Sequence, residues 1–195
     1  MTLPGGRKGL TAKMLRDGVR AGARVDTPLG EVAAERLAVG DAVLLAGGGI
    51  GIVKWIGRTD TLPAIAIPAG TLDGRLPRRP LRGGRDQPIL VAPDLLVPAH
   101  LLFAPAGDSE GGPYLQISLN DGACLLAEGA ALASADGPAD VVPEPDDRRP
   151  PLTTAGPGLA AARRAIGARS PLADPATRTA HLAAALAAID SLSPS

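Results

Sequence analysis

The chain has 195 residues, which is enough for one domain with a hydrophobic core and a tail. Lys and Arg together number 20, as do Asp and Glu, so the formal net charge of zero gives no electrostatic reason to expect a nucleic acid or an anionic membrane as partner. The single Trp, Tyr and Phe also argue against binding by aromatic stacking.

Cysteine and histidine are too few for the sites that they usually form. A single cysteine, Cys124, excludes an internal disulfide. A zinc site built on Cys124, His100 and His181 would need carboxylates to complete it, so we predict no metal and no cofactor. The N-terminus has no apolar signal segment and no stretch is long enough to cross a bilayer. We therefore expect a soluble, cytoplasmic protein without a membrane span.

Residues 1–17 read as a loose lead-in, and residues 18–134 as one all-β domain of many short strands. Strands are expected at 23–27, 41–45, 50–56, 64–67, 88–91, 95–98, 101–104, 114–119 and 123–127. The three glycines at 47–49, between two apolar runs, give the clearest hairpin signal. Residues 70–87, rich in Gly, Pro and Arg, are expected to form a long irregular loop.

The composition changes after residue 134. Residues 135–156 are rich in proline and acidic residues and read as a linker, followed by a helical tail over 157–195. A short helix is expected from Gly158 to Ala168, and a second helix from Asp174 and Pro175 onward. In the second helix, residues 182, 186 and 189 form an apolar stripe. We expect this stripe to pack back on the β domain, with a dimer helix as the alternative.

A series of short motifs, in order, resembles the bacterial Hedgehog/intein (Hint) domain family. Residues 21–32 resemble the family's opening, which reads C-F-x-x-G-T-x-I-x-T-P-x-G, and residues 35–43 resemble V-E-x-L-x-x-G-D-x-V. Further matches are W-I-G-R at 55–58, I-P-A-G-T-L at 67–72, P-R-R at 77–79, L-V-P-A-H-L-L at 96–102 and L-L-A-E-G at 125–129. The resemblance covers about residues 18–134 and implies a compact, curved all-β fold.

Hint domains rearrange the peptide bond before their first cysteine. The thiol attacks the preceding carbonyl, a histidine donates a proton to the departing amine, and inteins add an asparagine at the end of the domain. At the matching positions this sequence departs from the family. Gly18 stands at the nucleophile, and residues 84–87 stand at S-P-D-H, so that Asp86 is retained and Gln87 replaces the histidine. Gly122 falls on a third family position, a histidine just before L-L-A-E-G, and the sole asparagine, Asn120, lies in an interior turn.

Glycine has no atom with which to attack, and glutamine cannot serve as a general acid or base near neutral pH. Among other reactive residues, Cys124 reads as a small buried apolar residue and His181 as solvated, while Thr11 has no base in view. His100 is expected on a strand, as a surface or structural residue or, alternatively, as a displaced base.

Two further features have structural interpretations. Trp55, the only large aromatic residue, is expected to plug the core. An arginine cluster at positions 75, 78, 79, 82 and 85 is expected to be a solvated basic loop balanced by acidic residues elsewhere. The alternative is a site for phosphate or an acidic partner, because arginine pairs well with such groups.

These departures from the family pattern indicate a degenerate Hint-type domain. We interpret it as a pseudoenzyme, a binding or structural module with a protein as its partner. The alternative is residual autoprocessing, a self-cleavage or splicing-type rearrangement carried out by displaced residues. A third hypothesis is an accessory domain whose tail, over residues 157–192, is the interaction element.

Overall fold

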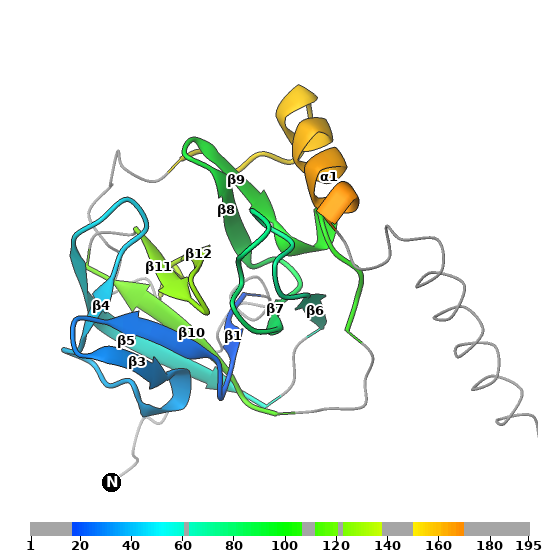
Figure 1. Cartoon of the computed structure of the whole chain (residues 1–195). Helices are drawn as coiled ribbons and strands as arrows, with labels where there is room; N and C mark the ends of the chain where they lie inside the picture. Colours follow the sequence, from blue (N-terminus) through cyan, green and yellow to red (C-terminus); the bar gives the residue numbers. More distant parts are fainter. Residues whose placement is uncertain (1–16, 61–62, 107–111, 121–122, 138–149, 170–195) are drawn as a thin grey trace, which may run out of the picture.

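Two antiparallel β-sheets of six strands each make up most of the described chain (Figure 1). The computed structural model describes residues 17–60, 63–106, 112–120, 123–137 and 150–169. The two sheets confirm the expected all-β fold class. Within the described residues, no helix is long and apolar enough to cross a membrane.

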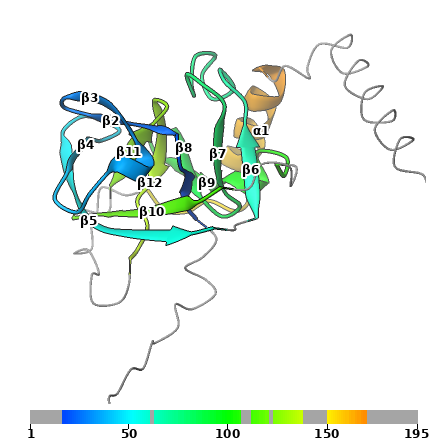
Figure 2. The same ribbon diagram turned by 90° about the horizontal axis from the view of Figure 1, so that it is seen from below.

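The first sheet buries the start of the domain between other strands. Its order is β4 (Ala42–Leu44), β5 (Ile50–Thr59), β10 (Tyr114–Leu119), β1 (Val19–Arg20), β7 (Leu81–Gly84) and β6 (Ala64–Ile67). The long pair of β5 and β10 runs along one border of the molecule (Figure 2). Short strand β1 pairs with β10 on one side and with β7 on the other. Gly18, directly before β1, therefore lies in the interior.

The second sheet packs its apolar side chains into the same core. Its order is β3 (Gly30–Ala33), β2 (Arg24–Thr27), β11 (Cys124–Ala127), β12 (Ala130–Ala133), β8 (Pro88–Ala92) and β9 (Leu95–Pro98). The core is aliphatic, as the composition requires: residues from both sheets contribute, including Val25, Val53, Ile65, Ile89 and Leu119. Burial of this apolar area is the main favourable term that holds the sheets together.

Most of the expected strands lie where the sequence predicts, and the triglycine hairpin joins β4 to β5. Three expectations were wrong. The region 70–87 is not one loop, because it contains β7, in which the buried Gly83 and Gly84 leave room for close backbone approach. Residues 101–104 form no strand. His100 belongs to a 3₁₀-helix, η3 (Ala99–Leu101), one of two such turns with η2 (Ala34–Arg36). Strands β1, β3 and β12 were not anticipated.

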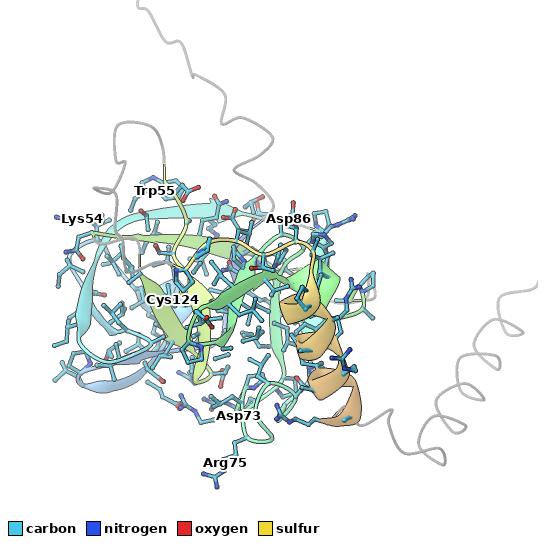
Figure 3. All side chains as sticks on the ribbon, turned by 90° about the horizontal axis from the view of Figure 1, so that it is seen from above. Lys54, Trp55, Asp73, Arg75, Asp86 and Cys124 are labelled. Atoms are coloured by element: carbon cyan, nitrogen blue, oxygen red, sulfur yellow. The ribbon has the colours of Figure 1, made fainter. Side chains whose placement is uncertain are left out.

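Trp55 does not plug the core, contrary to the expectation from sequence. It is only half-buried, and Figure 3 places it on the outer side of β5. The indole lies over Gly57, where a Cβ atom would come within 2.2 Å of the ring. The missing side chain of Gly57 therefore provides the surface on which the ring rests, and the interior is filled mainly by aliphatic residues.

A C-terminal extension covers the edge of the second sheet at β9. The backbone amide of Thr153 donates to the carbonyl of Leu96 at 2.7 Å. The predicted short helix is confirmed as α1 (Pro157–Arg169), which buries Leu159 and Ile166 and stands beside the β8–β9 hairpin in Figure 1. Two predictions, the second helix from Asp174 and the solvated His181, lie outside the described residues, as does Thr11.

Candidate functional site

The buried peptide unit at Gly18 is held by backbone and side-chain groups from three segments. Its N–H donates to Oε1 of Gln87 at 2.9 Å, and its carbonyl accepts from the amide of Gly84 at 2.7 Å. The φ angle of Gly18 is +138°, which L-residues rarely adopt. A Cβ atom there would come within 3.0 Å of the carbonyl oxygen of Leu115. The backbone is thus fitted to a glycine.

Gln87 is fixed in the orientation that presents an acceptor to Gly18. The side chain is 4 % exposed, and its Nε2 donates to the carbonyls of Ala133 at 2.9 Å and Pro88 at 3.2 Å. Because the amide nitrogen has two acceptors, the oxygen is the atom that faces the N–H of Gly18. Gln87 therefore acts here as a hydrogen-bond acceptor.

A second glutamine holds the residue on the other side of the same peptide bond. Nε2 of Gln116, on β10, donates to Oδ1 of Asp17 at 3.0 Å. We refer to Gln87 and Gln116 as the glutamine pair, since together they fix the two residues of the Asp17–Gly18 bond. The cavity beside them has a volume of only about 10 Å³, room for a single water at most.

Asp86 and His100 form a separate contact on the turn that carries Gln87. Nδ1 of His100 lies 3.2 Å from Oδ1 of Asp86, and the two side chains are 29 % and 36 % exposed. Backbone bonds fix this arrangement, because the amide of His100 donates to the carbonyl of Arg85 and that of Ala99 to the carbonyl of Gln87. The imidazole is therefore anchored close to the turn.

Comparison with known proteins identifies the family. A family model described as "Hint domain" matches residues 18–136, which is more than half of the chain. The chain belongs to the Hint domain family. The match begins at Gly18 and ends shortly after β12, so α1 lies beyond it.

Solved intein structures resemble this Hint domain at low sequence identity. A bacterial intein-like domain from Clostridium thermocellum has 16 % identity and a TM-score of 0.48, with 60 % of this chain and 97 % of that chain covered. The MchDnaB-1 intein has 12 % identity and a TM-score of 0.45, with 60 % and 98 % covered. The zinc-bound splicing domain of the Msm DnaB1 intein has 12 % identity and a TM-score of 0.42, with 60 % of this chain and 98 % of that chain covered. No curated protein matches the chain.

The Hint domain brings some of the predicted site residues together and separates others. Gly18 and Gln87 are in direct contact, whereas Asp86 contacts His100 instead. Cys124 is buried, as predicted, and lies on β11. Gly122 falls outside the described residues. Among the residues that are described, no group of three or more His, Cys, Asp or Glu side chains could hold a metal ion.

Sequence reasoning missed an ionic cluster that fastens the β6–β7 loop of the Hint domain to β2, β3 and β11. Glu128 is 3 % exposed; its Oε2 accepts from Nε of Arg79 at 2.6 Å, and its Oε1 from the amide of Arg24 at 2.7 Å. Arg78 lies 2.9 Å from Glu31 and also pairs with Asp26. The sequence signal for this cluster is Glu128, a charged residue directly after the apolar run 125–127.

The pKa values of this cluster shift as ion pairing requires. The hydrogen bond from Arg79 lowers the pKa of Glu31, while bonds to Glu128 and Glu31 raise the pKa of Arg79. The bond to Asp26 raises the pKa of Arg78. For Arg78 and Arg79 the structure thus favours charge balance by acidic residues of the same domain over a free site for phosphate.

Proposed function

We propose that this Hint domain does not cleave its own chain and serves as a binding or structural module. The contact between the N–H of Gly18 and Oε1 of Gln87 carries the proposal. In the family's chemistry, residue 18 would supply the attacking atom and residue 87 would handle the proton of the leaving amine. Here the first position has no side chain and the second accepts a hydrogen bond from the nitrogen that would have to be protonated.

The surroundings of Gly18 support the same proposal. Among the described residues, the groups that contact it include the Gln87 amide, the Gly84 amide, the Leu115 carbonyl and the Gln116 side chain. None of these is a thiol, a hydroxyl or an imidazole, so none can form an ester or thioester with the carbonyl of Asp17. Leu115 also restricts the space in which a nucleophilic side chain would have to lie.

One observation favours the alternative, residual autoprocessing with displaced residues. The imidazole of His100 contacts the retained Asp86, next in sequence to Gln87. A histidine paired with a carboxylate is a common general base. In this alternative His100 would take a proton from a water molecule or an added thiol, which would attack the carbonyl of Asp17, and would return the proton to the departing amine of Gly18.

Intact-mass spectrometry of the full chain decides between the two functions. The chain would be incubated for hours with and without dithiothreitol or hydroxylamine, which trap thioesters and esters. We expect an unchanged mass under all conditions. Loss of residues 1–17 would overturn the proposal, and loss that disappears in His100→Ala would establish the alternative. The double variant Gly18→Cys/Gln87→His, treated in parallel, restores both family side chains and serves as the comparison.

A further inference from the structure

An apolar groove lies on the Hint domain, away from the Gly18 site. It has a volume of about 1070 Å³ and lies between the tip of the β4–β5 hairpin, the β6–β7 loop, β8 and the β11–β12 hairpin. Its large aliphatic side chains are the buried Leu45 and six others, Leu44, Leu72, Leu76, Leu90, Val91 and Leu126. Each of the six is only half-buried, unlike the core residues beneath them.

Such a concentration of partly exposed aliphatic side chains indicates that something covers them. A single exposed leucine is ordinary, but a contiguous apolar hollow of this size is typical of a surface that binds another apolar element. The groove also borders Asp73, which lies on the β6–β7 loop and is labelled in Figure 3. Because the lining is mainly aliphatic, the occupant should present several aliphatic side chains on one face.

Helix α1 ends at the rim of this groove. The guanidinium of Arg169, the last residue of α1, donates to the backbone carbonyl of Leu72, which lines the groove. Arg163 fixes the preceding turn by donating to the carbonyl of Leu101 at 2.7 Å. The last described residue of α1 therefore lies beside the groove.

The sequence after α1 carries the kind of face that the groove requires. Leu182, Leu186 and Ile189 recur at helical spacing, after the helix-start signal of Asp174 and Pro175. We propose that residues 174–192 of the same chain dock in the groove as an amphipathic helix. This goes beyond the proposed function, because it names what occupies the apolar surface of the module.

The tether makes docking within one chain favourable. Extended, the five residues from Arg169 to Asp174 span at most about 18 Å, and the first eight residues of the helix add about 12 Å, so the stripe can begin up to about 30 Å from the rim at Arg169. A short flexible tether gives an effective concentration on the order of millimolar. In proteins most of a helix's stability comes from packing of its apolar face, so burial of the stripe in the groove would stabilise this helix.

Cys124 provides a reporter, because it is the only cysteine and lines the groove at 5 % exposure. The test compares the full chain with the double variant Leu182→Glu/Leu186→Glu. The matched control Ala184→Glu/Ala188→Glu adds the same charge on the opposite side of the expected helix. The readouts are the rate of native-state thiol labelling of Cys124 and hydrogen exchange of the Leu72–Leu76 segment and of β12.

We expect labelling and exchange in the groove to rise at least about fivefold in the leucine variant and less than twofold in the control, with exchange of β10 unchanged in both. Equal rates in the wild type and the leucine variant would overturn the proposal. So would protection that grows with protein concentration together with a dimer in analytical ultracentrifugation, because the groove would then hold the tail of a second copy. Neither readout depends on self-cleavage, which the intact mass reports separately.

Discussion

The backbone nitrogen of Gly18 and the side-chain oxygen of Gln87 are joined by a buried hydrogen bond of 2.9 Å across 69 residues of sequence. These are the two positions at which the Hint pattern expects a nucleophile and a histidine. Glutamine keeps a polar atom within reach of the backbone at residue 18, as a histidine would, but it cannot change protonation state near neutral pH. The bond therefore has a structural role, which is what the proposed non-cleaving module requires of this position.

Gln87→Leu should destabilise the fold by about 2–4 kcal/mol. The substitution leaves the N–H of Gly18 and the carbonyls of Ala133 and Pro88 without the partner that Gln87 supplies, and buried unsatisfied groups are costly. Urea denaturation followed by circular dichroism measures the change. Gln87→His is the comparison, because an imidazole keeps one acceptor and one donor and should cost less. A stability of Gln87→Leu equal to that of the wild type would contradict this assignment.

Gly18→Ala should lower the free energy of unfolding by about 2–5 kcal/mol, through backbone strain and through steric crowding. Gly22→Ala is the control that separates these two effects. At Gly18 the φ of +138° disfavours any side chain, and the new Cβ would meet the Leu115 carbonyl at 3.0 Å. At Gly22 the φ is +89°, but nothing lies within 4 Å of a Cβ. Gly22→Ala should therefore lose only the conformational part, about 1 kcal/mol. Equal losses in thermal or urea unfolding would show that crowding at Leu115 is unimportant.

The strands and turns of this domain were largely predictable because they depend on local signals. The alternating apolar residues of Tyr114–Leu119 and the three glycines after β4 each specify their element within a few residues. The family motifs predict that Gly18 and Gln87 match the site positions; the structure shows that these two residues are in contact, and their roles remain a prediction.

The missed features depend on contacts between distant segments. Strand β7 has glycines at 83 and 84, which weaken a strand signal, yet Gly83 pairs with Val19 of β1 and the amide of Gly84 donates to the carbonyl of Gly18. Trp55 looked like a core residue by size alone, but Gly57 offers it an outer surface. The bond between Gln116 and Asp17 spans 99 residues and has no sequence signature.

Glu128→Gln should destabilise the domain by about 2 kcal/mol or more, although the two side chains have nearly the same shape. Both carboxylate oxygens of Glu128 accept from N–H donors, one on Arg79 and one on the Arg24 backbone. An amide supplies only one oxygen, so its NH₂ group would face a donor at a buried site. Urea unfolding measures the loss. Glu31→Gln removes a far more exposed acid of the same cluster and should change stability little, so equal effects would contradict the role given to Glu128.

The Asp73 carboxylate should make the stability of the β6–β7 loop dependent on acidity. It accepts the backbone N–H groups of Arg75 and Leu76 at 2.8 and 2.7 Å, and the bond from Arg75 is the largest cause of a folded-state pKa below the ordinary value of 3.8. A lowered folded pKa means that the ionised carboxylate adds stability above about pH 5, which is lost as the pH falls through 3.8 and then through the folded value. Because the side chain is exposed, Asp73→Ala should cost only about 0.5–1 kcal/mol at pH 7. That difference from the wild type should shrink between pH 5 and pH 2 in urea titrations. Asp73→Asn keeps an acceptor but does not titrate, so the difference in unfolding free energy between Asp73→Asn and Asp73→Ala should not change with pH. If the difference between the wild type and Asp73→Ala were also independent of pH, the role of the charge would be refuted.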